Sequence, residues 1–276
     1  MIHLQDFNTL ESLATKHAIL CGSQTMTWRV WGSGSPAILL HGSVGSWTHW
    51  VRNIGALAER HTVYVPDLPG YGDSDLLLRE PTFDNLSAAI WSSFDALCPR
   101  RPDVALVGFS FGSVLAECMA LARNDQVRRI LLLRGNFSDK TPRPPAGMQK
   151  WRHLKDAPEL AATQRHNLAL SMFHDHTRID DQAVSLHIDN CNRSVADHVA
   201  FFPSRPVDAL KSIAAEVHGI AGEFDCYGLP DLWEQGRALL DTRPDARFHL
   251  VPQAGHWTMY EAPETVNQIL LESLAS

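Results

Sequence analysis

Apolar runs alternate with amphipathic stretches along most of this 276-residue chain. Short runs rich in Val, Ile and Leu indicate buried strands, and apolar positions spaced three and four apart indicate helices. The pattern predicts strands at 37–42, 62–67, 103–110, 127–135, 214–221 and 247–252, and helices at 47–60, 81–98, 111–124, 231–240 and 263–274. Buried strands that alternate with helices pair in parallel, so we expect an α/β fold with helices on both faces of the sheet.

Two regions depart from this alternation. After a short polar stretch, residues 17–34 predict two strands that turn at Gly22 and Ser23, which is typical of an antiparallel hairpin. The alternation also stops after Arg134, where prolines accumulate, and resumes near residue 214. We therefore expect a core domain made of residues 1–135 and 211–276, interrupted by a helical insertion at 136–210.

Composition narrows the class of protein. The chain is 45% hydrophobic and 20% charged, and its net charge of -7 offers no electrostatic reason to expect nucleic acid or an anionic membrane as partner. No apolar stretch approaches the ~20 residues of a membrane helix. We expect a globular protein with a small-molecule partner, and the sequence is compatible with a homodimer without specifying one.

The N-terminal sequence and the cysteines indicate the cellular compartment in which the protein is expected. Gln5, Asp6 and Glu11 stand where a secretory signal needs a basic leader and an unbroken apolar run, so we expect the mature protein to begin at or near Met1. The five cysteines are odd in number, far apart and without a Cys-x-x-Cys pair. That usage favours reduced thiols and a cytoplasmic protein.

Ser110 is the first candidate for chemistry. It stands between Gly108 and Gly112, at the junction of a predicted strand and a predicted helix. Such a sharp turn presents the hydroxyl at the edge of the sheet, where larger residues in place of the glycines would collide with neighbouring backbone. A serine in a tight turn without chemistry is the alternative. The hydroxyl becomes a nucleophile only if a base takes its proton.

Two further strand ends supply the partners. His256 follows the strand at 247–252 and precedes the last helix, with Gly255 leaving space beside it. Asp225 follows the strand at 214–221, and Glu223 is its competitor for the carboxylate role. The order Ser110, Asp225, His256 predicts a catalytic triad. Although His174 and His176 are metal-ligand types, they face apart at this spacing, no third ligand is evident, and the triad needs no metal or cofactor.

Three motifs carry a resemblance to a known family: HGSVG (41–45), DLPGYGDSD (67–75) and GFSFG (108–112). From about residue 20 onward the chain resembles the α/β-hydrolase superfamily, and in particular small bacterial hydrolases with a helical cap after the sixth strand. The resemblance implies that Ser110 is the nucleophile, His256 the base and Asp225 its partner. It also implies that the backbone N–H groups of Ser43 and Phe111 form the oxyanion hole.

Two of these motifs have structural interpretations as well. HGSVG lacks the Gly-Lys-Ser/Thr end of a nucleotide-binding loop, so its N–H groups suit an oxyanion, with His41 bracing the loop. Asp67 of the DLPGYGDSD segment is expected to tie that loop together. We expect the aromatic side chains near the site to include substrate contacts, with Trp47, Phe173, Phe202 and Trp257 as candidates.

Three functions remain open on sequence. A serine in GFSFG favours acyl transfer, whereas haloalkane dehalogenases and epoxide hydrolases carry aspartate there, so the first hypothesis is a carboxylesterase for a small or medium apolar ester. The second is a carbon–carbon bond hydrolase of the meta-cleavage-product type, acting on vinylogous diketones; Arg134, Asn136 and Arg193 are candidates for binding its substrate carboxylate. The third is a ligand-binding homologue without turnover, which an intact triad argues against.

Overall fold

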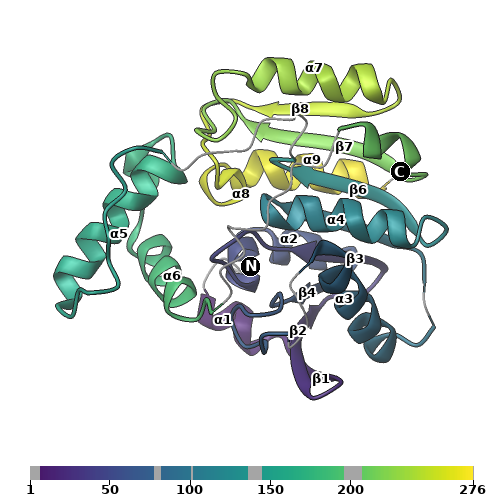
Figure 1. Ribbon diagram of the computed structural model, residues 1–276, viewed down its shortest axis with the longest axis horizontal. Helices are drawn as coiled ribbons and strands as arrows, with labels where there is room; N and C mark the ends of the chain where they lie inside the picture. The colour runs from purple at the N-terminus through teal and green to yellow at the C-terminus, as the bar shows by residue number, and fades with distance from the viewer. Residues whose placement is uncertain (1–6, 78–81, 101, 136–144, 196–206, 276) are drawn as a thin grey trace.

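One eight-stranded sheet runs through the centre of the molecule (Figure 1). The computed structural model describes residues 7–77, 82–100, 102–135, 145–195 and 207–275. The strand order is β1-β2-β4-β3-β5-β6-β7-β8, with β1 and β2 antiparallel to their neighbours and all pairs from β4 to β8 parallel. The strands are β1 (Thr15–Cys21), β2 (Gln24–Trp31), β3 (Ser35–Leu40), β4 (His61–Pro66), β5 (Val104–Phe109), β6 (Val127–Leu133), β7 (Glu216–Gly222) and β8 (Arg247–Val251). The predicted hairpin and mostly parallel sheet are confirmed.

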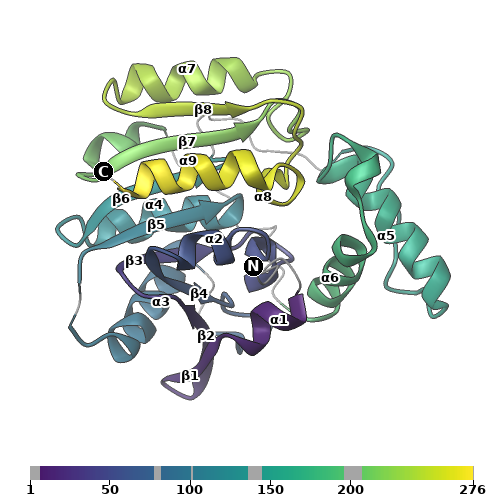
Figure 2. The same cartoon turned by 180° about the vertical axis from the view of Figure 1, so that it is seen from behind.

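Helices cover both faces of the sheet. In Figure 1, α3 and α4 lie in front of the sheet, and Figure 2 shows α2 and α9 across the opposite face. Strand side chains alternate between two buried clusters: Ile130 and Leu132 pack on the α3–α4 side, and Leu131 and Leu133 pack on the α2–α9 side. The helices are α1 (Phe7–Ser12), α2 (Ile54–Ala58), α3 (Phe83–Leu97), α4 (Phe111–Ala122), α5 (Ala157–Ser171), α6 (Asp181–Asn192), α7 (Leu232–Thr242), α8 (Thr258–Glu261) and α9 (Pro263–Ala275).

The helix predicted at 47–60 is divided in two. A 3₁₀ turn, η1, spans Trp47–Trp50 with Ser46 as its N-cap, and α2 begins only at Ile54. Between them, the Asn53 amide donates to the carbonyl of Met259 and to the Asn267 side chain. These bonds to α8 and α9 lie far along the chain, so a periodic pattern within 47–60 cannot reveal the break.

The described part of the chain between β6 and β7 contains helices and no strand. Residues 145–195, here called the inserted segment, hold α5, the 3₁₀ turn η2 (His176–Arg178) and α6, and a further 3₁₀ turn, η4 (Val207–Ser212), precedes β7. In Figures 1 and 2, α5 and α6 stand beside the sheet, at the edge where the parallel strands end. The Trp257 N–H donates to Met172 O over 2.8 Å and joins the inserted segment to the chain after β8.

In the part of the chain that the structure describes, there is neither a disulfide nor a membrane-spanning helix. All five cysteines are free. Over the described residues, every helix is too short or too polar to cross a bilayer.

Candidate active site

Ser110 lies in a strained turn between β5 and α4. Its backbone angles are φ 53° and ψ -114°, and its N–H donates to Leu133 O over 2.8 Å. The flanking glycines have no room for side chains: a Cβ on Gly108 would lie 2.3 Å from Gly112 O, and one on Gly112 would lie 2.3 Å from Leu40 O. The turn therefore has the strand–turn–helix form that the sequence predicts, with the hydroxyl at the carboxyl end of the sheet.

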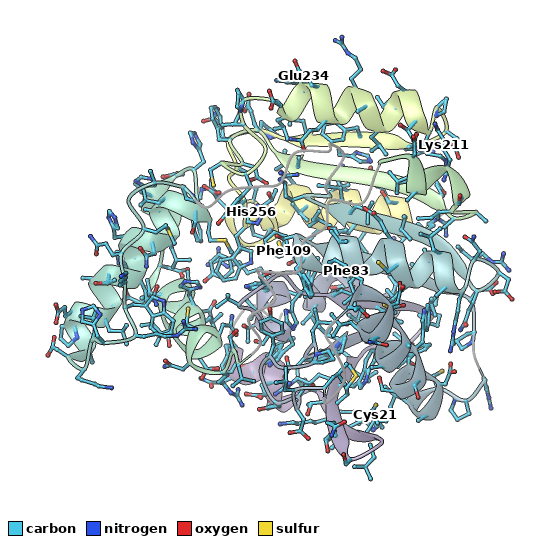
Figure 3. The ribbon with its side chains drawn as sticks, viewed as in Figure 1. Cys21, Phe83, Phe109, Lys211, Glu234 and His256 are labelled. Atoms are coloured by element: carbon cyan, nitrogen blue, oxygen red, sulfur yellow. The ribbon has the colours of Figure 1, made fainter. Side chains whose placement is uncertain are left out.

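His256 and Asp225 complete a chain of hydrogen bonds to Ser110. His256 Nε2 lies 3.2 Å from Ser110 Oγ, and His256 Nδ1 lies 2.9 Å from Asp225 Oδ2. Figure 3 shows His256 beside Phe109, between the sheet and the inserted segment, and the two ring centroids are 4.9 Å apart. Three residues separated along the chain thus meet in the geometry of a nucleophile, its base and an orienting carboxylate.

The carboxylate of Asp225 is fully buried and stays ionised. Burial raises its pKa, but the pKa is lowered overall by His256, by Arg134 and by the Tyr227 N–H, which donates to Oδ1 over 2.9 Å. An ionised Asp225 accepts the Nδ1–H of His256, which leaves the Nε2 lone pair facing Ser110. Glu223 does not share this role, because its carboxylate accepts the Gln253 N–H at a more exposed position.

The HGSVG loop lies next to Ser110. A Cβ on Gly42 would lie 3.3 Å from Ser110 Cβ. His41 braces the loop as expected: its Nε2 accepts the Leu68 N–H over 2.9 Å, and its Nδ1–H therefore donates to Gly42 O over 2.8 Å. The hydroxyl oxygen of Ser43 is buried without a hydrogen-bond partner in the described structure.

His49 supports the same loop and was not singled out by sequence. Its Nδ1 accepts the Gly42 N–H over 3.3 Å, and a Cβ on Gly45 would lie 2.2 Å from its Cε1. Burial, together with the neighbouring imidazoles of His41, His187 and His256, lowers the pKa of His49 well below its usual value. His49 is thus a neutral ring that packs beneath the glycines, and its proximity to them depends on the turn at η1.

The sequence matches the alpha/beta hydrolase family over residues 37–269, which is most of the chain. The chain belongs to this family. The fold expected from the sequence is therefore confirmed.

Relatives and solved structures with similar chains are hydrolases. The 2-hydroxy-6-oxo-6-phenylhexa-2,4-dienoate hydrolase of Burkholderia cepacia is 28% identical over 261 residues, covering 89% of each chain. The 2-hydroxymuconate semialdehyde hydrolase of Pseudomonas putida is 28% identical over 261 residues, covering 88% of each. In fold, the chain is similar to the meta-cleavage product hydrolase of Pseudomonas fluorescens IP01, with TM-score 0.76, 22% identity and coverage of 94% of this chain and 97% of that one. A carboxylesterase of Bacillus subtilis gives TM-score 0.77, 20% identity and coverage of 97% and 95%. Together, these findings support a hydrolase.

The structure describes three of the four aromatic residues expected to line a pocket, and all three are buried. Trp47 was expected to contact substrate, but it is buried in the core, stacked on Phe7 at 5.3 Å between centroids and close to Trp31 at 5.5 Å. Trp257 is fully buried, and Phe173 packs against it at 5.9 Å, where the inserted segment meets the chain after β8. Phe202 lies outside the described residues.

Two arginines expected to bind a substrate carboxylate have protein partners instead. Arg134 donates to Gly135 O, Gln235 Oε1 and Tyr227 O, and its Nε faces Asp225. Arg193 pairs with Asp73 and Asp189. Sequence shows these cations but not the acceptors that tertiary folding brings to them. Asn136 lies outside the described residues.

The DLPGYGDSD segment forms an ionic cluster beside the HGSVG loop. Asp67 accepts the Trp47 N–H over 2.9 Å and the Asp73 N–H over 3.0 Å, and it pairs with buried Arg29 at 3.0 Å. Asp73 also pairs with Lys16 and with Arg193 at the end of α6. Asp67 thus ties the loop together as expected, and Asp73 extends the cluster to the inserted segment.

Glu261 connects the His256 turn to the inserted segment, and sequence reasoning missed it. Its buried carboxylate accepts the N–H groups of Gly255, His174 and Asp175 over 2.7, 3.0 and 2.6 Å. The His174 ring stacks on Phe224 at 3.8 Å, which is a packing role. In the part of the chain that the structure describes, no group of three or more His, Cys, Asp or Glu side chains could hold a metal ion.

Proposed function

We propose that this protein is a serine-dependent hydrolase that cleaves a carbon–carbon bond in a vinylogous diketone of the meta-cleavage-product type. The hydrogen-bonded chain from Ser110 through His256 to Asp225 carries the proposal, because it provides an activated nucleophile. Relatives that span 88–89% of the chain are named for this substrate class. They reverse the preference for a carboxylesterase that the sequence suggested.

In the proposed first step, Ser110 Oγ attacks the ketone or aldehyde carbonyl beside the scissile carbon–carbon bond while His256 Nε2 takes the hydroxyl proton. The N–H groups of Ser43 and Phe111 hold the resulting oxyanion. Support for this assignment comes from position: Phe111 directly follows Ser110, and the loop that contains Ser43 adjoins Ser110 through Gly42. The ionised Asp225 stabilises the imidazolium.

The tetrahedral intermediate then collapses and the carbon–carbon bond breaks. The bonding electron pair moves into the conjugated enone fragment, which leaves as a dienolate and takes a proton from His256 to become a dienol. Ser110 retains the acyl group as an ester. Water, deprotonated by His256, attacks this ester and releases a carboxylic acid and free Ser110.

We further propose that residues 136–210 form a cap over a core made of residues 1–135 and 211–276. Contacts of the inserted segment support this division. The Ser46 hydroxyl donates to the Asn190 side chain of α6 over 2.7 Å, and the Cys226 thiol donates to Ser171 O over 3.4 Å. The inserted segment therefore touches both the loop after β3 and the turn that carries Asp225, which suits a lid over a small molecule.

A carboxylesterase is the second candidate, and one observation favours it. Arg134 and Arg193, the described arginines expected to receive a substrate carboxylate, are bonded to protein acceptors. A site in which these charges are already paired suits an uncharged substrate. The same Ser110, His256 and oxyanion donors would perform acyl transfer on an ester.

Parallel assays separate these functions. Turnover of 2-hydroxymuconate semialdehyde, followed by loss of its dienolate absorbance, is compared with release of p-nitrophenol from short-chain esters. The proposal predicts a kcat/KM at least tenfold higher for the dienoate, with both activities lost in Ser110→Ala and retained in Ser43→Ala, which removes a neighbouring hydroxyl. A higher kcat/KM for the ester would support the second candidate. If a fluorophosphonate does not label Ser110, both are wrong, and a ligand-binding homologue remains.

A further inference from the structure

A buried arginine stands directly behind the proposed catalytic carboxylate. Arg134 follows β6, and its side chain is only 6% exposed. Its Nε lies 3.5 Å from Asp225 Oδ2, the same oxygen that accepts His256 Nδ1–H at 2.9 Å. The Arg134 Nε atom has no hydrogen-bond partner in the described structure, so it faces Asp225 as a charge rather than as a bonded donor.

The rest of the guanidinium holds the turn that carries Asp225. Its Nη2 donates to Tyr227 O, and its Nη1 donates over 3.0 Å to the Gln235 amide, which in turn donates to Gly228 O. The backbone of Arg134 is fixed as well: it has φ 57°, and its N–H donates over 2.8 Å to Ile220 O of β7. A side chain held at both ends positions its charge with little freedom.

We infer that Arg134 is a positioning residue that holds the Asp225 turn and sets the pH range in which His256 acts as a base. This inference rests on the proposed function of the triad. A cation beside Asp225 offsets part of the carboxylate charge that would stabilise the imidazolium. Without Arg134, the full charge of the Asp225 carboxylate would act on the imidazolium.

The other titratable groups that face the pair are Cys226 and Tyr227 from the same turn and His49 from η1. Burial raises the pKa of the Cys226 thiol to about 12 and raises the pKa of the Tyr227 hydroxyl above its usual value. Burial lowers the pKa of His49 well below its usual value. All three are neutral near pH 7. Burial lowers the pKa of Arg134 overall, Asp225 offsets only part of this effect, and the guanidinium remains charged.

The rate of Ser110 labelling by a fluorophosphonate, measured between pH 4 and 9, tests the inference without knowledge of the substrate. The labelling rate falls at acidic pH, and this part of the pH–rate profile is its acid limb. In Arg134→Gln, the acid limb is expected to move to higher pH by roughly one unit. At a given pH on that limb, the labelling rate should therefore be about tenfold lower than in the wild-type protein. Arg134→Lys keeps a charge and is expected to keep the wild-type limb, with a lower plateau because the fork of hydrogen bonds is lost.

Gln235 offers a second pair of variants that leaves Arg134 in place. Gln235→Glu puts a negative charge against the guanidinium and should move the limb upward, whereas Gln235→Met should lower stability without moving it. This pair decides the matter if Arg134→Gln does not fold. The inference is overturned if the acid limb of the labelling rate lies at the same pH in Arg134→Gln, in Gln235→Glu and in the wild-type protein. Failure of the wild-type protein to label at Ser110 would instead overturn the proposed function.

Discussion

The carboxylate of Glu261 accepts a 2.7 Å hydrogen bond from the N–H of Gly255, the residue that precedes His256. Because Glu261 also accepts the N–H groups of His174 and Asp175, one buried side chain holds both the His256 turn and the inserted segment. The position of the proposed base is thus coupled to the segment that we propose as a cap.

Glu261→Gln should destabilise the protein and reduce turnover. An amide offers one acceptor oxygen where the carboxylate has two, so its NH₂ group would face a backbone N–H; the loss in free energy of unfolding should be about 2–3 kcal/mol, measured by urea denaturation. Glu223→Gln is a matched control, since Glu223 accepts one N–H at a more exposed site. Equal losses in the two variants would contradict the coupling.

Ser43→Ala should leave kcat nearly unchanged, whereas Ser43→Pro should lower it by roughly 100-fold or more. The reason is that the Ser43 hydroxyl is buried without a partner, and only proline removes the N–H that we assign to the oxyanion hole. Single-turnover kinetics on a p-nitrophenyl ester or a dienoate would measure the difference. A large loss in Ser43→Ala would count against a purely backbone role.

Asp225→Asn should lower kcat by on the order of 10³–10⁴-fold. A neutral amide neither stabilises the imidazolium nor fixes the Nδ1–H form of His256, and it also leaves the charge of Arg134 without its carboxylate. Steady-state kinetics with a thermal melt on the same sample would separate lost activity from lost folding. Asp245→Asn, which removes the exposed partner of Arg243, is the control and should retain activity.

Asp73→Asn should destabilise the protein in a pH-dependent way. Burial opposes ionisation of Asp73, but hydrogen bonds from Lys16 and Arg29 outweigh it, and the pKa falls from 3.8 to about 2. A lowered pKa in the folded state stabilises that state fully above pH 3.8, and the contribution disappears as pH falls towards 2.

The cost of Asp73→Asn at pH 7 should be about 1–2 kcal/mol after screening by solvent. Urea denaturation at pH 7 and near pH 2 measures the change, and the difference from wild type should vanish at the lower pH. Asp189→Asn removes the more exposed partner of Arg193 and should cost less than about 0.5 kcal/mol. A deficit in Asp73→Asn that is the same at both pH values would show that charge is not its cause.

Local signals explain why the elements could be predicted. The strand before Ser110 and the helix after it need only periodicity and two glycines, and the backbone dictates both glycines, since any side chain there meets Gly112 O or Leu40 O. The meeting of Ser110, Asp225 and His256 could also be predicted without the structure. Each follows a strand of a parallel sheet, and the carboxyl ends of parallel strands share one edge.

The residues that each side chain contacts in the folded protein could not be predicted in the same way. An aromatic residue near the site packs into a core or lines a pocket according to what faces it, and Trp47 meets Phe7 and Trp31 across the fold. Arg134 is likewise a cation in the sequence, but only folding brings Tyr227, Gln235 and Asp225 to it. His49 and Glu261 carry no local signal at all, because their partners are backbone N–H groups.

The sequence by itself determined the α/β architecture, the serine turn and the chain order of the three residues that meet there. These depend on periodicity, on the absence of side chains at two glycines and on the shared edge of parallel strands, all of which are local or topological. The tertiary structure alone decided which buried charges and imidazoles surround the Ser110–His256–Asp225 chain. Their effects act through space over a few ångströms, between residues that lie as far apart in the chain as Arg134 and Asp225.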